Sequence, residues 1–394
     1  MPISADPKPG PLSNEQISEL RSHFPILREK TYLYNCSQGA LSDTVESGMQ
    51  KFAASWRTSA APWDEWMETY EALRGAFAHF INAQPDEVAI VTSASAGINP
   101  IANAVSFDER NKVVMSEYEF PTMGHIWLAQ RPRGAEIHFL DGVNNTVPTE
   151  CYEQAIDNKT RIVPLTHVSF VNGFRSDVAA IARIAHARGA LLLLDGYQDC
   201  GTRPIDVKAL DVDCFVTGTL KYLLGPPGLG FLYVRRELIE TLTPTITSWM
   251  AQRDPFTFNP RYLDPSPTAR RFEGGSPPIP NIYLARPAID MLAGIGMHNV
   301  AAQIERLTHA FLNGVRDLRI DSKTPASSVG PLVVLRARDT NAAAAVLAKL
   351  TARGIAVSTR RDGVRFAFHV YNTLEDINIA LTALEDTREL LARL

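Results

Sequence analysis

The sequence contains few cysteines, and their positions exclude two common structural roles. Its 394 residues include four, Cys36, Cys151, Cys200 and Cys214, scattered along the chain. A disulfide framework needs more cysteines in a shorter chain, and none of the four forms the C-x-x-C pair typical of zinc sites. The sequence therefore predicts reduced thiols, no metal site and a cytoplasmic location.

Long apolar runs and charge of one sign are also absent. No stretch of about 18 apolar residues could span a membrane, and the first residues, MPISADPKPGPLS, lack the apolar core of a secretory signal. The 39 basic and 43 acidic residues are well mixed and give a net charge of -4, so there is no basic footprint for nucleic acid or a membrane surface. We expect a small molecule as the partner, and neither nucleic acid nor membrane.

Apolar segments alternate with helical segments over much of the chain. Between two of them, the segment 176–189 has an N-cap candidate in Ser176 or Asp177 and ends at Gly189, which predicts a crossover helix. The alternation predicts an α/β lobe with a mostly parallel sheet, in which ligands bind at the carboxyl ends of strands. The strands are expected at 88–91, 112–115, 161–168, 191–195, 213–218 and 231–234.

A proline-rich stretch at 245–280 separates this lobe from a different pattern. After it the sequence predicts a helical stretch over 281–317, then a smaller βαββα lobe whose last helix begins with a capping box of Thr373 and Asp376. The expected divisions are an N-terminal arm (1–25), a large domain (26–250), a junction loop (251–280) and a small C-terminal α+β domain (281–394).

Two opposite charges follow neighbouring strands of the expected sheet. Four leucines precede Asp195, and Lys221 follows the next strand. A turn cap at Gly196 explains Asp195 structurally, and a simple ion pair would explain both residues. Alternatively, a desolvated lysine forms imines with aldehydes, and a buried carboxylate stabilises a protonated ring nitrogen. Pyridoxal phosphate carries both groups and would engage both residues.

The segment VTSASAGINP at 91–100 predicts a place for the phosphate of such a cofactor. Ser93, Ser95 and Gly97 follow a strand and open a helix, where hydroxyls and free backbone N–H groups bind anions. Two other motifs are excluded. SASAG lacks the first glycine of G-x-S-x-G, and GPPGLG at 225–230 precedes a strand where a dinucleotide fingerprint would precede a helix.

The motifs DGYQ at 195–198, TGTLKY at 217–222 and GPPGLGFLYV at 225–234 together resemble fold-type I pyridoxal-phosphate enzymes of the class V aminotransferase family. That group includes cysteine desulfurases, kynureninases and isopenicillin N epimerase-like proteins. The resemblance extends from TYLYNCSQGALS at residue 31 to VYNTLEDI at residue 370. It implies pyridoxal 5'-phosphate as the cofactor, an amino acid as the substrate and a homodimer with shared active sites.

The resemblance also implies roles for individual residues. Lys221 would form the Schiff base, Asp195 would partner the pyridine nitrogen, and Gln198 would bind the ring hydroxyl. In this family a flat side chain stacks on the ring, and the other subunit reaches the phosphate. The remaining cofactor residues would be Ala94, Ser95 and Thr219 at the phosphate, Phe120 on the ring, and Gly275 and Ser276 from the partner subunit.

Arg365 has two interpretations. In VRFAFHV the alternation places Arg365 on the face opposite Val364 and Phe366, where a solvated arginine would be ordinary. The segment also resembles the family's strand whose arginine binds the substrate α-carboxylate, a task that suits its fork of donors. We favour the substrate-binding interpretation.

Departures from relatives narrow the reaction. The segment 355–368 lacks the nucleophilic cysteine of desulfurases, and Met123 and Leu220 replace an aspartate and a tyrosine of kynureninases. We therefore predict a lyase that eliminates a β-substituent, such as one bound through sulfur, from an amino acid. Aminotransferase and epimerase activities are the alternatives. A non-catalytic interaction module is the alternative of another class, and the intact set of Lys221, Asp195, Gln198 and Arg365 disfavours it.

Overall fold

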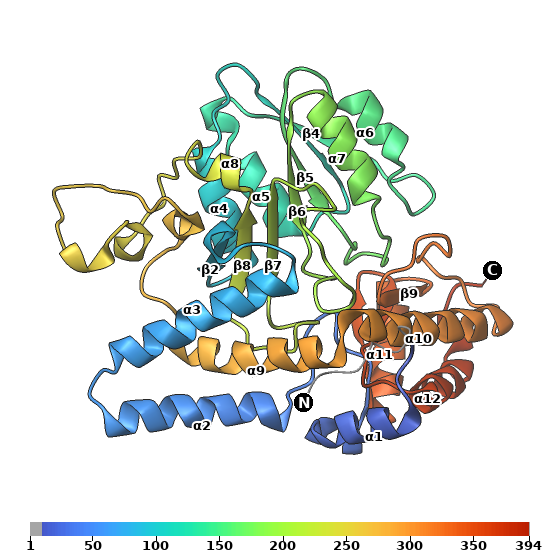
Figure 1. Ribbon diagram of the computed structural model, residues 1–394. Helices are drawn as coiled ribbons and strands as arrows, with labels where there is room; N and C mark the ends of the chain where they lie inside the picture. Colours follow the sequence, from blue (N-terminus) through green and yellow to red (C-terminus); the bar gives the residue numbers. More distant parts are fainter. Residues whose placement is uncertain (1–9, 394) are drawn as a thin grey trace.

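A seven-stranded sheet forms the centre of the larger lobe of the computed structural model, which describes residues 10–393 (Figure 1). The strand order is β2-β8-β7-β6-β5-β3-β4, and only β8 runs antiparallel to its neighbours. The predicted α/β fold with a mostly parallel sheet is confirmed. The strands are β2 (Val88–Val91), β3 (Lys112–Ser116), β4 (Glu136–Leu140), β5 (Thr160–Thr166), β6 (Leu191–Asp195), β7 (Cys214–Gly218) and β8 (Gly230–Val234).

Most of these strands match the apolar runs of the sequence. β2 and β6 have the predicted ends, and the others differ by one or two residues. β4 was not predicted, because this strand lies at the sheet edge and exposes Glu136, His138 and Phe139, so it has no continuous apolar run. The reversed direction of β8 is also not visible in an apolar run, which has the same composition in either direction.

Helices cover both faces of the sheet, and successive residues of β6 show how. Leu193 packs into the core beneath α4 and α5, whereas Leu192 and Leu194 join the core on the opposite face with α3 and α7. This follows from the alternation of side chains along a strand. The helices of this lobe are α3 (Trp63–Phe80), α4 (Ala94–Ala104), α5 (Pro121–Leu128), α6 (Thr149–Ala155), α7 (Val178–Ala187) and α8 (Arg236–Ile239).

The C-terminal lobe has its own antiparallel sheet and its own core. The order β11-β12-β9 joins Ser358–Arg360, Gly363–Ala367 and Leu332–Arg336. The expected capping box of Thr373 and Asp376 begins the last helix. The helices of this lobe are α10 (Met297–Asp317), α11 (Thr340–Ala352) and α12 (Leu374–Glu385).

The N-terminal segment packs against the C-terminal lobe. β1 (Thr31–Tyr32) pairs in parallel with β10 (Ile355–Ala356), and Arg21 of α1 (Asn14–Ser22) forms an ion pair with Asp376 at 2.9 Å. Strand pairing between such distant segments leaves no local mark in a sequence. The domain limits themselves stay a prediction.

Two long helices and a protruding junction complete the structure. α9 (Ile279–Ile295) packs against α2 (Asp43–Thr58) and α3 along the lower edge of the molecule in Figure 1. The junction between β8 and α9 extends to the left of the sheet as loops with three short 3-10 helices, η4 (Trp249–Ala251), η5 (Pro255–Thr257) and η6 (Ala269–Phe272). Within residues 10–393, no helix is long and apolar enough to cross a membrane.

Candidate active site

A cavity of about 300 Å³ lies where β5, β6 and β7 end and α4 begins. This is the edge of the sheet at which ligands of open α/β folds bind. Its walls come from segments far apart in the chain, so the fold alone brings them together. Seven residues proposed from the sequence line it: Ser93, Ala94, Ser95, Phe120, Asp195, Gln198 and Lys221.

Lys221 stands three residues beyond β7 with its side chain between two aromatic rings. Its Nζ lies 4.3 Å from the centroid of the Tyr197 ring and 5.6 Å from that of Phe120. Burial lowers the pKa of Lys221 to about 8, since desolvation of the ammonium outweighs the attraction of Asp195. Among the described residues Lys221 has no ion pair, so a simple salt bridge does not explain it. The environment favours the neutral amine that a nucleophile requires.

Asp195 ends β6 and is 7% exposed. One carboxylate oxygen, Oδ1, accepts the N–H of Tyr197 at 2.8 Å, so the residue does cap the turn, as its structural interpretation requires. Burial raises the pKa of Asp195, while the Tyr197 N–H and Lys221 act in the opposite direction. The turn cap and an electrostatic role toward a cation in the cavity are therefore compatible.

The first turn of α4 is arranged to bind an anion. Ser93 caps the helix, with its Oγ accepting the N–H of Ala96 at 3.1 Å and its carbonyl accepting that of Gly97 at 3.1 Å. Neither bond uses the N–H groups of Ala94 and Ser95, which belong to the turn where a helix has no internal acceptors. Because both residues line the cavity, the positive end of the helix dipole is directed toward it.

Gln198 carries a buried acceptor without a partner. Its Nε2 donates to the carbonyl of Cys36 at 3.0 Å, which fixes the orientation of the side chain. Its Oε1 is buried and has no hydrogen-bond partner within the part of the chain that the structure describes. Buried polar atoms are rarely left unsatisfied, so this oxygen fits a ligand that brings a hydroxyl donor.

Phe120 stands at the start of α5, at the mouth of the cavity. It is 42% exposed, which argues against an ordinary core role. Its ring meets that of Phe170 edge to face, with centroids 5.1 Å apart. This exposed flat surface beside Lys221 can stack on an aromatic ligand.

Arg365 is 1% exposed, so the solvated strand face that the sequence analysis offered as an alternative is wrong. Both faces of β12 are buried. Its Nε donates to Ser358 Oγ at 3.0 Å and its Nη2 to Ser37 Oγ at 2.9 Å, and burial lowers its pKa. Ser37 lines the cavity while Arg365 lies directly behind it. The guanidinium has no carboxylate partner among the described residues.

Besides Arg365, three residues to which the resemblance gives a role lie outside the cavity. Thr219 turns away from it, because its hydroxyl donates to the carbonyl of Pro226 at 2.5 Å and its N–H to that of Leu229 at 3.1 Å. These bonds hold the loop between β7 and β8, and they leave Thr219 no donor for a phosphate. Gly275 and Ser276 are exposed on the junction, away from the cavity of their own chain.

The sequence analysis missed other residues of the cavity. Tyr197 stands between two proposed residues in DGYQ, and Ser37 stands in YNCSQG, so proximity to a motif was an available signal. Phe170 and Thr166 carry no such signal, because they reach the cavity through the pairing of β5 with β6 and the loop after it.

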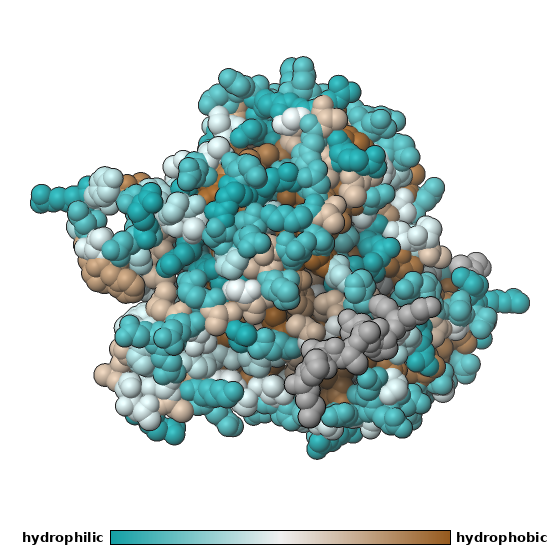
Figure 2. Space-filling view, in the orientation of Figure 1, coloured by the Kyte–Doolittle hydropathy of each residue, from teal (hydrophilic) through white to brown (hydrophobic). Residues whose placement is uncertain are grey.

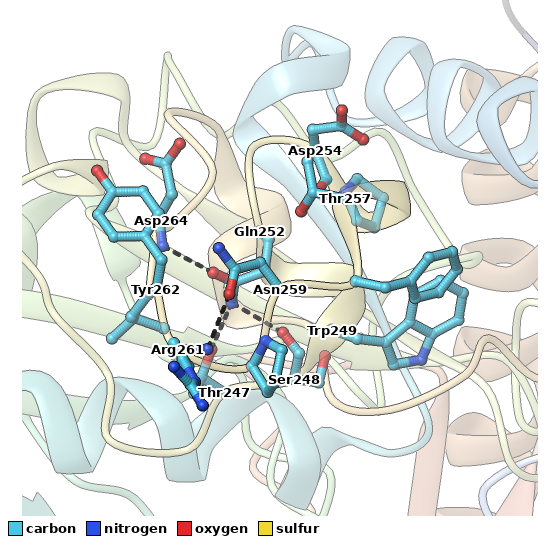
Figure 3. A pocket seen from close by; sticks show the side chains of 14 residues that line it. Thr247, Ser248, Trp249, Gln252, Asp254, Thr257, Asn259, Arg261, Tyr262 and Asp264 are labelled. Carbon is cyan, nitrogen blue, oxygen red and sulfur yellow. Dashed lines mark hydrogen bonds between the residues drawn. The ribbon is translucent and has the colours of Figure 1, made fainter.

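A second, larger cavity of about 660 Å³ lies within the junction (Figure 3). Residues 247–264 form it almost alone, with Gln252 at its centre. Gln252 Nε2 donates to the carbonyl of Ser248 at 2.9 Å, and Gln252 Oε1 accepts the N–H of Asp264 at 2.9 Å. It shares no lining residue with the cavity at Lys221.

The cavity at Lys221 defines a class of protein. An amine of lowered pKa, a buried carboxylate and a helix N-terminus suit a phosphate-bearing aldehyde with a basic ring. The profile of the family described as aminotransferase class-V matches residues 32–379, and the chain belongs to this family. It is a pyridoxal-phosphate-dependent enzyme, as the sequence predicted, and the non-catalytic alternative is dropped.

Several proteins of known sequence resemble the chain along most of its length. The uncharacterized aminotransferase YcbU of Bacillus subtilis is 32% identical over 92% of this chain and 96% of its own. A probable cysteine desulfurase of Streptomyces coelicolor is 29% identical over 96% of this chain and 98% of its own. A cysteine desulfurase of Haloferax volcanii is 30% identical over 82% and 80%.

Solved structures show the same fold. The apo cysteine desulfurase of Thermococcus onnurineus superposes with a TM-score of 0.85 at 22% identity, covering 95% of this chain and 98% of its own. The cystine C-S lyase C-DES, in complex with cysteine persulfide, also has a TM-score of 0.85, at 21% identity over 92% and 99%. At these identities the likeness concerns the fold alone.

Proposed function

We propose that this protein is a pyridoxal-phosphate-dependent lyase that removes a substituent from the β-carbon of an amino acid, most readily one bound through sulfur. The relatives support this class of reaction, since they include cysteine desulfurases. The observation that carries the proposal is Lys221, held between two rings with a lowered pKa and facing Asp195 across one cavity. An aminotransferase is the alternative, supported by the relative YcbU.

The cysteines disfavour persulfide transfer as the reaction. Cys36, Cys200 and Cys214 are buried, and Cys151 is half-buried in α6. Cys36 lies closest to the cavity, but its sulfur contacts Ser358 Oγ at 3.5 Å and it is 1% exposed. A thiol that accepts sulfur from a substrate must be accessible as a thiolate. This agrees with the missing cysteine in the segment 355–368.

The cavity residues take the following proposed roles. When bound, the cofactor supplies an electron-withdrawing ring that weakens the bonds at the substrate Cα. Lys221 would hold its aldehyde and, once released, move the proton at Nζ. Asp195 would keep the ring nitrogen protonated, and the free Oε1 of Gln198 would accept the ring hydroxyl. The N–H groups of Ala94 and Ser95 would bind the phosphate, and Phe120 would stack on the ring.

Substrate recognition is assigned to Arg365 with Ser37. The guanidinium lies behind the cavity wall without a carboxylate partner, and its bond to Ser37 Oγ connects it to the cavity. A substrate α-carboxylate would satisfy this buried positive charge. Thr219 is left out of the proposed site, because its hydrogen-bonding groups are occupied.

We also propose a homodimer in the cytoplasm. The junction exposes Phe256, Phe258, Tyr262 and Leu263, with Phe258 71% exposed, and Figure 2 shows apolar atoms on this protrusion. Exposed apolar groups of this size are typical of interfaces. A second subunit bound at the junction would place its own cavity within reach of Gly275 and Ser276. The four free cysteines support a reducing compartment. Light scattering after gel filtration tests the dimer.

One experiment separates the reactions. The holo-protein is incubated with a panel of amino acids that includes cysteine and cystine, and pyruvate, other keto acids, ammonia and substrate chirality are measured. Release of pyruvate and ammonia together from a sulfur-bearing substrate supports the lyase. Keto acid formed only with a second keto acid as amino acceptor supports the aminotransferase, and loss of chirality without either product supports an epimerase.

A further inference from the structure

A second buried carboxylate, Glu119, lies beside the cavity and has no role in the proposed site. It follows β3, immediately before Phe120, and is 6% exposed. Ser116 Oγ donates to its Oε1 at 2.9 Å and Thr166 Oγ1 donates to its Oε2 at 2.5 Å. No lysine, arginine or histidine pairs with it among the described residues. A buried carboxylate without a cationic partner needs an explanation.

Thr166 connects Glu119 with the cavity. It lines the cavity and is the register partner of Asp195, where β5 pairs with β6. Glu119 in the loop after β3, Thr166 on β5 and Asp195 on β6 therefore follow one another in the order of the sheet. Thr166 and Asp195 line the cavity and form its floor, and the charge of Asp195 acts on Glu119.

The groups that face Glu119 favour its protonated form. Burial and the charge of Asp195 raise the pKa of Glu119 from its usual 4.5 to about 7, against the bonds from Thr166 and Ser116. From α6, Tyr152 faces the same carboxyl group, and its pKa is raised by burial and by Glu119, so it stays neutral. The positive charge of Lys221 acts on Asp195, whose pKa it lowers. Glu119 thus changes protonation state at ordinary pH.

The protonation state determines what Thr166 offers to the cavity. Against an ionised Glu119, the Thr166 hydroxyl must donate its hydrogen to the carboxylate and presents only lone pairs elsewhere. Against a protonated Glu119, the carboxylic acid can donate to Thr166 Oγ1, which frees the hydroxyl hydrogen. The floor then changes from an acceptor to a donor.

We propose that Glu119 is a positioning residue, which through Thr166 sets whether the cavity floor donates or accepts a hydrogen bond toward the bound cofactor. This inference rests on the proposed function, since it takes this cavity as the pyridoxal-phosphate site. In the proposed site the cofactor group at Asp195, the register partner of Thr166, is the protonated ring nitrogen, which is a hydrogen-bond donor. The acceptor state, with Glu119 ionised, is therefore the state that binds the cofactor more tightly.

The test measures pyridoxal phosphate binding and stability on apo-protein between pH 5 and pH 8. Glu119→Gln removes the charge and cannot titrate. Thr166→Val removes the connecting hydroxyl, and Thr166→Ser is the matched control that keeps it. Dissociation constants come from quenching of tryptophan fluorescence, and melting temperatures from the same samples show that each variant folds. Lys221 and the cofactor titrate in every variant, so the ratio of the wild-type dissociation constant to that of a variant removes their contribution.

We expect the ratio of the wild-type dissociation constant to that of Glu119→Gln to be near one at pH 6 and to fall about threefold or more by pH 8, the size of one modest hydrogen bond. Thr166→Val should lose this pH step and Thr166→Ser should keep it. The melting temperature of the wild type should fall relative to Glu119→Gln between about pH 5 and pH 7, because stability is lost between the usual pKa of 4.5 in the unfolded chain and the raised pKa of about 7 in the folded one.

Each other outcome overturns the inference or its foundation. If the difference in melting temperature between the wild type and Glu119→Gln does not change with pH, Glu119 does not titrate between pH 5 and pH 8. A difference that follows pH while the ratio of dissociation constants stays flat would show a structural carboxyl without influence on the cavity. If the wild type fails to bind pyridoxal phosphate at any pH, the proposed site itself fails, which is a separate result.

Discussion

Two cavities of this protein, one in the junction and one at Lys221, differ in size and in what surrounds them. The junction cavity has about 660 Å³ and is formed by one continuous segment, residues 247–264, which also exposes Phe258 and Tyr262 (Figure 3). The cavity at Lys221 has less than half that volume and is assembled from strand ends and a helix N-terminus. By volume alone, the junction cavity would be the better candidate for a ligand site.

Buried charge distinguishes the cavities better than volume does. Asp195 is buried and Lys221 is half-buried, and desolvation shifts the pKa values of both. In the junction, Arg253 and Asp264 pair at 3.2 Å with both side chains exposed, an arrangement that costs and contributes little. A fold retains desolvated, unpaired charges mainly where a ligand uses them. Buried charge, which is costly to maintain without a ligand, therefore identifies the cavity at Lys221 as the candidate active site.

The largest effect should come from Lys221→Ala. We expect loss of the visible absorbance band of the cofactor and a fall in turnover of at least about 100-fold, because the variant lacks both the covalent anchor and the acid–base group. Absorbance spectra and initial rates check this. Lys349→Ala, which removes an exposed lysine of α11, is the control and should match the wild type. If Lys221→Ala stayed yellow and active, buried charge would not distinguish the cavity at Lys221 from the junction cavity.

Arg365→Ala should have the next largest effect. The lost charged hydrogen bonds cost roughly 1.5 to 3 kcal/mol, which raises KM by roughly 10- to 100-fold for an amino-acid substrate. The cofactor band should persist, since Arg365 lies behind the cavity wall. Steady-state kinetics measure the change, with Arg353→Ala on the exposed end of α11 as the control. An unchanged KM would exclude Arg365 from substrate binding.

The pH dependence of cofactor capture should show the lowered pKa of Lys221. The neutral amine is the nucleophile, so the capture rate on apo-protein should rise with a midpoint near pH 8, where an exposed lysine would give one near its usual 10.5. Asp195→Asn should move the midpoint to lower pH, because Asp195 stabilises the ammonium form. Stopped-flow absorbance measures the rate. A midpoint that stays above pH 10 would mean that Lys221 is solvated.

The same contrast explains what could be predicted from the sequence. Asp195 and Lys221 follow apolar runs, so local pattern located both strand ends and, through the parallel sheet, their common edge. Glu119 and Thr166 become neighbours only through pairing of β3 with β5, and local pattern does not encode such pairing. Thr219 has a residue type suited to phosphate, but the loop carbonyls that occupy it are a tertiary feature.

The smallest effect should come from Gln252→Ala, at the centre of the junction cavity. The variant loses the bonds to the Ser248 carbonyl and the Asp264 N–H, each worth about 1 kcal/mol. Because the segment is partly exposed and packs mainly on itself, we expect faster proteolysis of residues 247–264 with cofactor affinity within about twofold of the wild type. Limited proteolysis and fluorescence titration measure the two effects. A large loss of cofactor affinity would instead show that the junction of one subunit completes the site of its partner, and the two cavities would then belong to one active site.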